Sequence, residues 1–355
     1  MAGPLARCAV CAALTCAKCA SGVCPTLEMP RSSGIKRLAQ DVLLKLERVR
    51  RKAVWLMFDS TIGRAVGLAA LQMAMLTTGC LAETQDQGDE PESELGSQAQ
   101  EVTGPWQRVL TENFSSSASL GAWQVTSRAD YNSSICNYVP GAVSFGTEDG
   151  KGVMRLTATK ISSSNYQSGH VKSNYSFKPG YNEEYRVSAS IKLIAMNGAS
   201  FTGFASTYGA WPAFWTVQET SWPTKGEIDI LEAYSFGGSA TFSSNLFYGT
   251  SSGQNLLSNS CLSSWSTGEG WHTYDEYWKN VNGAVAVTTQ LDGATKATYT
   301  NAKNASLRLE NFGPHNIILN LAIGSNYGTF NNANINLFSK TMMWVDYVTV
   351  DKRTL

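Results

Sequence analysis

The chain lacks any excess of charge of one sign. Its 355 residues include 28 basic and 28 acidic side chains, so the formal net charge is zero. Charged residues make up only 16% of the chain, against about a quarter in an average globular protein. A neutral chain without a basic run has no electrostatic attraction to nucleic acid, so we expect no nucleic-acid partner.

The region from residue 105 to 355 also lacks helical periodicity. No useful length of it repeats apolar residues every ~3.6 positions. Instead, segments with a period of two recur, rich in β-branched residues and bounded by Gly, Asn or Asp. They cover residues 153–159, 185–192, 285–291, 317–323 and 344–350. We therefore predict an all-β fold, a jelly-roll β-sandwich of two antiparallel sheets.

Residues 1–56 differ sharply from this region. They hold five of the eight cysteines, among them two CxxC pairs. Paired CxxC spacing is able to bind zinc, but the loops between the pairs are very short and no histidine is nearby. We interpret residues 1–56 as an unfolded presequence, or as translation upstream of a true start at Met57.

No apolar run near the N-terminus is long enough to cross a membrane as a stable helix. The run at residues 65–76 follows Arg64 and leads through small residues to Gly79 and Cys80. Residues 57–79 are therefore predicted to be a signal segment. The end of this segment resembles the lipobox of bacterial lipoproteins, with Thr77 where that motif prefers Leu, which implies acylation of Cys80; ordinary secretion is the alternative.

Residues 80–104 are polar and acidic, with almost no large apolar side chain. Such a stretch is unable to bury enough surface to fold, so we interpret it as a flexible tether. The prediction is a bacterial-type envelope lipoprotein that meets the membrane only through its lipid, or else a simply extracellular protein. Residues 105–355 then form one catalytic domain, which we expect to be a monomer.

Cysteine is scarce in this domain, where only Cys136 and Cys261 occur. In an oxidising compartment two cysteines suggest one disulfide, with two buried thiols as the alternative.

Aromatic residues, by contrast, are plentiful, with 10 Trp, 14 Tyr and 13 Phe. Flat aromatic faces beside amide and hydroxyl groups suit the binding of sugar rings, although the same residues also fill cores. Tryptophans crowd the residues before the apolar segment Gly226-Glu-Ile-Asp-Ile-Leu-Glu232, which carries three acids.

In a regular strand Glu227 and Asp229 share one face while Ile228 and Ile230 point into the core. Strict alternation would turn Glu232 to the core side. A single β-bulge near Ile230 and Leu231 brings all three acids to one face. Retaining glycosidases need an ionised carboxylate as nucleophile and a protonated carboxyl as acid, and like charges packed closely raise the pKa of one of them.

These motifs resemble glycoside hydrolase family 16, in the branch with a bulged Glu-x-Asp-x-x-Glu strand shared by laminarinases, agarases and κ-carrageenases. The resemblance extends from about residue 110 to 350 and includes Gly209-Ala-Trp-Pro-Ala-Phe-Trp215. It implies a concave glycan-binding cleft and a covalent glycosyl-enzyme intermediate. Glu227 would be the nucleophile, Asp229 the supporting acid and Glu232 the acid/base.

The resemblance also implies residues outside the acid strand. Trp211, Trp215 and Trp222 match positions along the glycan cleft, and we assign Asn245 and Tyr248 on the next strand to substrate binding as well. No cofactor is expected for catalysis. A structural calcium ion is implied, with Asp346 and Gly150 as its ligands, since hard oxygen donors suit calcium.

The implied substrate is a β-linked polysaccharide cut internally, β-1,3- or β-1,3-1,4-glucan. One departure weakens the β-1,3 assignment, because laminarinases commonly carry a histidine on the strand where this chain has Asn245-Leu-Phe-Tyr248. Agarose or carrageenan hydrolysis, transglycosylation and a non-catalytic glycan-binding domain stay open. A purely structural envelope protein would leave the acids and tryptophans unexplained.

Overall fold

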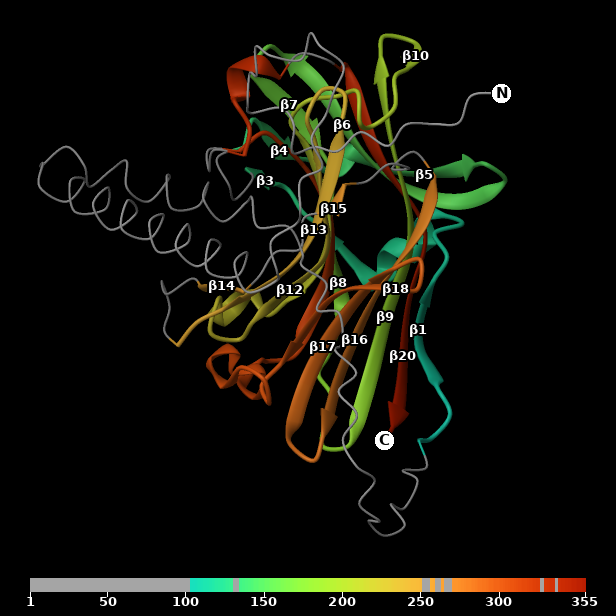
Figure 1. Cartoon of the computed structure of the whole chain (residues 1–355). Coiled ribbons are helices and arrows are strands. Elements are labelled where there is room, and N and C mark those ends of the chain that lie inside the picture. Colours follow the sequence, from blue (N-terminus) through green and yellow to red (C-terminus); the bar gives the residue numbers. More distant parts are fainter. Residues whose placement is uncertain are drawn as a thin grey trace, which may run out of the picture. The chain divides into compact units, whose positions relative to one another are not determined.

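A computed structural model describes residues 103–129, 134–250, 256–258, 263–264, 270–325, 329–335 and 338–355. The predicted presequence, signal segment, Cys80 and nearly all of the predicted tether lie outside these residues. Within them no helix is long and apolar enough to span a membrane. No α-helix occurs in the described part of the chain, and the predicted all-β class is confirmed (Figure 1).

The larger sheet, sheet A, has twelve strands. Its main path runs β18-β17-β16-β9-β20-β6-β7-β4-β3, with β1, β10 and β5 pairing at its sides. The strands are β1 (Gln107–Glu112), β3 (Arg128–Ala129), β4 (Cys136–Tyr138), β5 (Val143–Glu148), β6 (Lys151–Ser162), β7 (Asn165–Ser168), β9 (Glu183–Asn197), β10 (Ser200–Phe201), β16 (Trp271–Val281), β17 (Ala284–Leu291), β18 (Ala294–Thr300) and β20 (Lys340–Thr354).

The smaller sheet, sheet B, has eight strands in the order β14-β13-β12-β11-β19-β8-β2, with β15 pairing β13. Its strands are β2 (Trp123–Val125), β8 (His170–Phe177), β11 (Ala210–Val217), β12 (Glu227–Ser235), β13 (Ala240–Tyr248), β14 (Leu256–Ser258), β15 (Ser263–Ser264) and β19 (His315–Ile323). Short 3₁₀ turns connect strands at Ser117–Ala122, Pro140–Ala142, Glu219–Ser221, Ala305–Leu307, Leu309–Asn311 and Asn332–Asn334.

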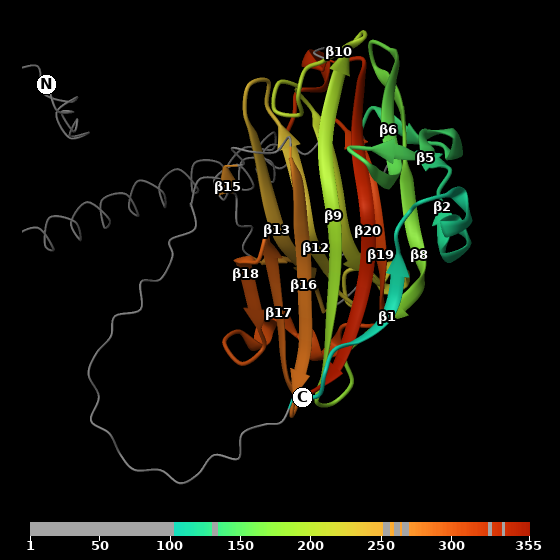
Figure 2. The ribbon, with the colours of Figure 1, turned by 90° about the vertical axis from the view of Figure 1, so that its right-hand side faces the viewer.

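The two sheets pack face to face, with β9, β16 and β20 in front of β12, β13 and β19 in Figure 2. All named strand pairs are antiparallel except β4 with β7. Each of the five segments predicted from its period of two lies within a strand, namely β6, β9, β17, β19 and β20. The sandwich prediction is therefore confirmed.

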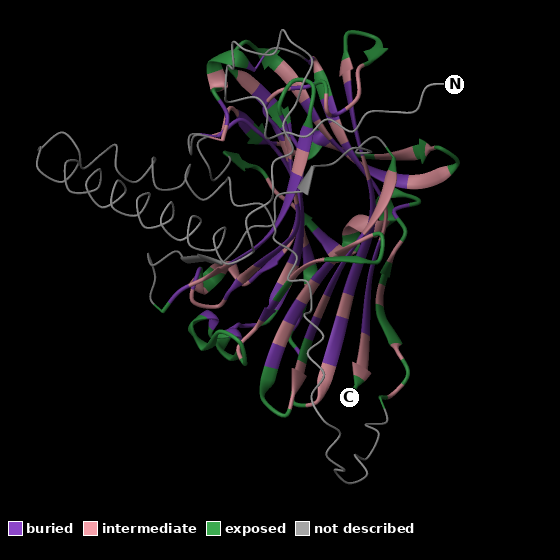
Figure 3. Ribbon diagram, viewed as in Figure 1, coloured by how far each residue is buried: buried purple, intermediate pink, exposed green. Residues whose placement is uncertain are grey.

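The core lies between the sheets, where every second residue of the long strands points. In β17, for example, Val285, Val287 and Thr289 are buried, and the residues between them are partly exposed. Figure 3 shows this alternation as bands along the strands. Burial of a large aliphatic side chain contributes about 1.5–3 kcal/mol, so this alternation fixes which face of each strand is left for solvent.

Candidate active site

Strand β12 carries the three acids and contains the predicted bulge. On its β13 side Asp229 pairs with Asn245 and Glu232 with Ser243, so three steps along β12 match two along β13. The register with β11 shifts at the same place. The extra residue falls at Ile230 and Leu231, and the β-bulge prediction is confirmed.

The acids and the apolar residues between them lie on opposite faces of β12, as their burial shows. Ile228, Ile230 and Leu231 are all buried in the core. Glu227 and Glu232 are partly exposed, and Asp229 between them is buried, at 2% exposure. The acids therefore share the face of sheet B that points away from the core, called the acid face below.

The residue before the first acid has to be glycine. Gly226 has a φ of 81°, in the left-handed region that L side chains rarely adopt. A Cβ atom there would also lie 2.3 Å from the ring of Phe312. The backbone therefore turns tightly under Phe312 and enters β12 with Glu227 on the acid face.

Two of the three predicted cleft tryptophans contact the acids. Trp222 donates its indole N–H to Glu227 Oε2 at 2.7 Å, and Trp211 donates to Glu232 Oε1 at 2.9 Å. Trp215 instead donates to Asn320 Oδ1 at 2.7 Å. Two tryptophans therefore orient the two glutamates, while a contact of any of the three with sugar stays a prediction.

The structure separates the two residues of β13 that we assigned to substrate. Asn245 is buried beside the acids and donates its amide N–H to Glu232 Oε2. Tyr248 packs against the hydrophobic core instead of the acid face. Phe247 takes the corresponding position on the acid face, opposite Glu227 in register and with its ring 6.3 Å from that of Trp222. One step along a strand exchanges the two faces, so we move the expected substrate contact from Tyr248 to Phe247.

Sequence reasoning missed Tyr234 and Ser243. Tyr234 lies 3.2 Å from Glu232 Oε2 and 3.2 Å from Ser243 Oγ. The spacing of two from Glu232 was a usable signal for Tyr234, since both side chains then share a face. Nothing in the sequence indicated Ser243, because its position depends on the β12–β13 register.

Burial raises the pKa values of all three acids, and neighbouring charges add to this effect at Glu227 and Asp229. Burial raises the pKa of Glu227 to about 8, the charge of Glu232 adds to this effect, and the Trp222 hydrogen bond opposes it. Burial and then the two glutamate charges raise the pKa of Asp229 well above its ordinary value. Burial also raises the pKa of Glu232, while hydrogen bonds from Asn245, Trp211 and Tyr234 lower it. The cluster therefore retains at least one proton near neutral pH, as general acid catalysis requires.

A fully buried polar chain lies behind the acid strand, between the sheets. Thr216 Oγ1 is 3.0 Å from Glu276 Oε2 and 3.1 Å from His315 Nδ1, and His315 Nε2 is 2.9 Å from the Lys225 carbonyl oxygen. A carbonyl only accepts, so His315 carries its hydrogen on Nε2. Burial lowers the pKa of His315 to about 4, so its Nδ1 accepts from Thr216.

Thr216 has a single hydroxyl hydrogen, which it donates to His315. Glu276 must therefore donate the hydrogen bond that joins it to Thr216, which requires that Glu276 is a neutral acid. Burial raises the pKa of Glu276 to about 8, in agreement with this assignment. The chain therefore ties sheet A, through Glu276 on β16, to the turn that precedes Glu227.

The two predicted calcium ligands lie on different elements, Gly150 in the turn between β5 and β6 and Asp346 in β20. Asp346 sits at a bulge of β20, and its Oδ2 accepts from Lys151 Nζ at 2.5 Å. Lys192 Nζ pairs in the same way with Asp149, at 2.7 Å. In the described part of the chain no group of three or more His, Cys, Asp or Glu side chains is able to hold a metal. The Lys151 ammonium group already occupies the Asp346 oxygen that a calcium ion would need. The two residues present therefore do not fit a calcium ion, even if the Gly150 carbonyl were a ligand.

Cys136 is buried in β4, with its sulfur 3.4 Å from Ser134 Oγ. Cys261 lies outside the described residues, so their disulfide stays a prediction.

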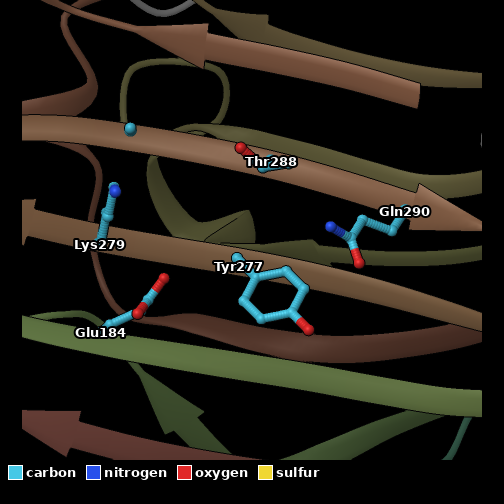
Figure 4. A pocket seen from close by; sticks show the side chains of 6 residues that line it. Glu184, Tyr277, Lys279, Thr288 and Gln290 are labelled. Atoms are coloured by element: carbon cyan, nitrogen blue, oxygen red, sulfur yellow. The ribbon is translucent and has the colours of Figure 1, made fainter. Parts of the chain in front are cut away.

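Shallow hollows occur on the outer face of sheet A. One of about 160 Å³ is lined by Glu184, Tyr277, Lys279, Ala286, Thr288 and Gln290 (Figure 4). Its carboxylate, Glu184, is paired with Arg353 at 2.5 Å. Because this hollow belongs to the other sheet, it takes no part in the chemistry of the acids.

The chain is similar to known proteins in its fold and in the sequence around the acid strand. The fold and the acid strand are those of a β-sandwich glycoside hydrolase. Residues 147–255 match the family model described as the XgeA-like, catalytic GH16 domain. This match includes the acid strand, and the expected resemblance to glycoside hydrolase family 16, a family of retaining endo-glycoside hydrolases, is confirmed. No curated protein matches the chain.

Solved structures agree in fold. An endo-1,3-β-glucanase from Streptomyces sioyaensis is 22% identical with a TM-score of 0.55, covering 74% of this chain and 99% of its own. A GH16 protein of the mixed linkage glucan PUL of Bacteroides ovatus, in complex with a G4G4G3G product, is 22% identical with a TM-score of 0.54, covering 68% and 99%. The laminarinase catalytic domain of Thermotoga maritima is 20% identical with a TM-score of 0.52, covering 70% and 98%. At these identities the likeness concerns the fold alone.

Proposed function

We propose that the domain hydrolyses β-1,3-glucan or mixed-linkage β-1,3-1,4-glucan, with Glu227 as nucleophile and Glu232 as acid/base. The observation that carries the proposal is the acid face of β12, where a tryptophan N–H orients each of two partly exposed glutamates on either side of a buried aspartate. The choice of substrate is supported by two of the similar structures, an endo-1,3-β-glucanase and a GH16 protein in complex with a G4G4G3G product.

Retaining hydrolysis proceeds in two steps. In the first, Glu232 gives its proton to the glycosidic oxygen, the bond from that oxygen to the anomeric carbon breaks, and a carboxylate oxygen of Glu227 bonds to that carbon. In the second, water attacks the anomeric carbon and its proton goes to Glu232, while the bond to Glu227 breaks. Asp229 serves as the buried neighbour that holds a proton and lowers the negative charge of the cluster.

The test is to incubate the purified protein with laminarin, lichenan, agarose and carrageenan and to size the products. We expect oligosaccharides of several lengths from laminarin or lichenan, since an endo-acting enzyme cuts inside the chain. Products from agarose or carrageenan alone would refute the glucan assignment and leave the family intact. No products from any of the four would refute the proposed activity on this panel.

We also propose that the protein is an envelope lipoprotein. The support is the order of sequence features alone: an apolar run behind Arg64, small residues ending in Cys80, and an acidic tether.

A further inference from the structure

Glu232 has three hydrogen-bond partners of two different kinds. Trp211 donates to Oε1 at 2.9 Å, Asn245 donates to Oε2, and the Tyr234 hydroxyl lies 3.2 Å from the same Oε2. Indole and amide N–H groups only donate, so they favour a carboxylate. A hydroxyl both donates and accepts, and Asn245 presents its Nδ2 to Glu232, so in this arrangement Tyr234 is the partner that is able to accept a hydrogen bond from protonated Glu232.

Ser243 lies on the other side of the Tyr234 hydroxyl. Its Oγ is 3.2 Å from the Tyr234 oxygen and accepts from Asn245 Nδ2 at 3.0 Å. The Ser243 hydroxyl therefore keeps one hydrogen and one lone pair for Tyr234. Two consistent arrangements exist: Ser243 to Tyr234 to ionised Glu232, or protonated Glu232 to Tyr234 to Ser243.

We propose that Tyr234 and Ser243 are positioning residues, a hydroxyl pair that reverses its hydrogen-bond direction as Glu232 loses and regains its proton. This inference rests on the acid/base role proposed for Glu232. When Glu232 protonates the leaving oxygen, Tyr234 turns its O–H towards the new carboxylate. When water returns the proton, Tyr234 turns back to Ser243.

Tyr234 itself keeps its hydrogen in both arrangements. Burial and the charge of Glu232 raise its pKa well above the ordinary value for tyrosine. The Trp211 ring, 5.3 Å from the Tyr234 ring, and the Phe330 ring, 6.3 Å away, hold the tyrosine in place. Removing the hydroxyl should therefore leave the ring where it is.

Few other groups facing Glu232 titrate. On its own strand these are Glu227, Asp229 and Tyr234. On β11 and β13 the described neighbours of Glu232 are Trp211, Asn245 and Ser243, which are neutral and do not titrate in this range. Burial and then the charge of Asp229 raise the pKa of Tyr299 on β18, so this tyrosine stays neutral.

The two hydroxyls predict pKa changes of opposite sign. Tyr234→Phe removes a donor from the carboxylate, so the pKa of Glu232 should rise and the alkaline limb of kcat/KM should move to higher pH. Ser243→Ala removes the group that accepts the Tyr234 hydrogen when Glu232 is protonated. Tyr234 is then left with the Glu232 carboxylate as the acceptor for its hydrogen, which favours the ionised form of Glu232. The pKa should then fall and the limb should move to lower pH. Tyr234→Phe should also lower kcat roughly 10- to 100-fold with little change in KM, since hydrogen bonds to charged groups are the strong ones.

The measurement is a pH–rate profile together with a ¹³C-carboxyl NMR titration of glutamate in the intact protein. Tyr299→Phe is the matched control, since it removes a buried hydroxyl that donates to the Ser244 carbonyl at 2.9 Å, and it should leave the titration of Glu232 unchanged. Shifts of the same sign in both variants, or no shift, would overturn the inference. An inactive wild-type protein would refute the proposed activity. The NMR titration needs no substrate, so it would still test whether the two hydroxyls shift the pKa of Glu232 in opposite directions.

Discussion

At the scale of single residues, the chemistry depends on two glutamates that differ in their surroundings. Glu227 has one indole donor, Trp222, whereas Glu232 has the indole of Trp211, the amide of Asn245 and the hydroxyl of Tyr234. Donors aimed at a group that gains negative charge during reaction stabilise the transition state. This asymmetry favours Glu232 as the group that changes its protonation state.

Replacing either glutamate by glutamine should reduce hydrolysis to below about one per cent of wild type, because the shape is kept and the reacting oxygen is lost. The unfolding temperature should stay unchanged or rise, since burial disfavours the charged form of both side chains. Activity on the preferred glucan and thermal unfolding, measured on the same samples, check both statements.

Azide separates the two roles. With an activated aryl glycoside, Glu232→Ala should yield a β-glycosyl azide and Glu227→Gly an α-glycosyl azide, because only the former still forms the glycosyl-enzyme. Equal anomers from both variants, identified by NMR, would contradict the assignment.

The residues identified from sequence were those whose spacing carries the signal. The spacing in Glu-x-Asp-x-x-Glu requires a bulge to bring its third acid to the same face as the other two, so the acid face was predictable from one strand. Asn245 was assigned to substrate and lies beneath Glu232, and Tyr248 was placed one residue off the acid face. Both placements depend on how β13 aligns with β12, which a single sequence does not encode.

At the scale of elements, the buried chain from Glu276 through Thr216 to His315 makes stability depend on pH. The folded state keeps Glu276 protonated up to about pH 8, whereas a glutamate in the unfolded chain ionises above about pH 4.3. The folded state therefore binds more protons between these values, and the contribution of this group to stability falls as pH rises through that window.

Glu276→Gln removes this titration and keeps a donor for Thr216. Relative to wild type, its free energy of unfolding should rise by roughly 3 kcal/mol between pH 5 and pH 8. Urea unfolding at several pH values measures the difference. Glu310→Gln, on the surface, is the control and should change stability by less than about 0.5 kcal/mol throughout. A constant offset for Glu276→Gln would contradict a buried neutral acid.

A second element-scale prediction concerns the turn between β5 and β6, where Lys151 holds Asp346. Because an ammonium group already supplies the positive charge, excess EDTA or calcium should leave the unfolding temperature of the wild-type protein within about 1 °C. Lys151→Ala exposes the carboxylate and is the variant in which calcium should stabilise, if it does so anywhere. A clear loss of wild-type stability in EDTA would restore the calcium ion inferred from the family resemblance.

At the scale of the whole molecule, the sandwich was predictable because apolar and polar residues alternate regularly in strands such as β6 and β17. The pairing order was not, since neighbours such as β1 and β20 are separated by most of the domain. Alternation reports which face of a strand is buried, and only the folded sheet reports which strand lies beside it.

The N-terminal features predict where the protein resides. Changing Cys80 to Ser in a bacterial host should move active enzyme from the membrane fraction to the soluble fraction, because an acylated cysteine with several chains would anchor it durably. Cys136→Ser is the matched control and should not change the distribution. Wild-type protein that is already soluble, with a mature N-terminus elsewhere than Cys80, would contradict the lipoprotein proposal.

The bulge in β12 also has a genetic consequence. Loss of one codon at Ile230 or Leu231 would leave the order Glu-x-Asp-x-Glu, in which plain alternation already turns all three carboxylates outward. The same reading frame would continue, and one apolar side chain would leave the core. The bulged pattern Glu-x-Asp-x-x-Glu and the regular pattern Glu-x-Asp-x-Glu thus differ by a single in-frame deletion. The change between them requires repacking around the lost apolar side chain, and it requires no new arrangement of the acids.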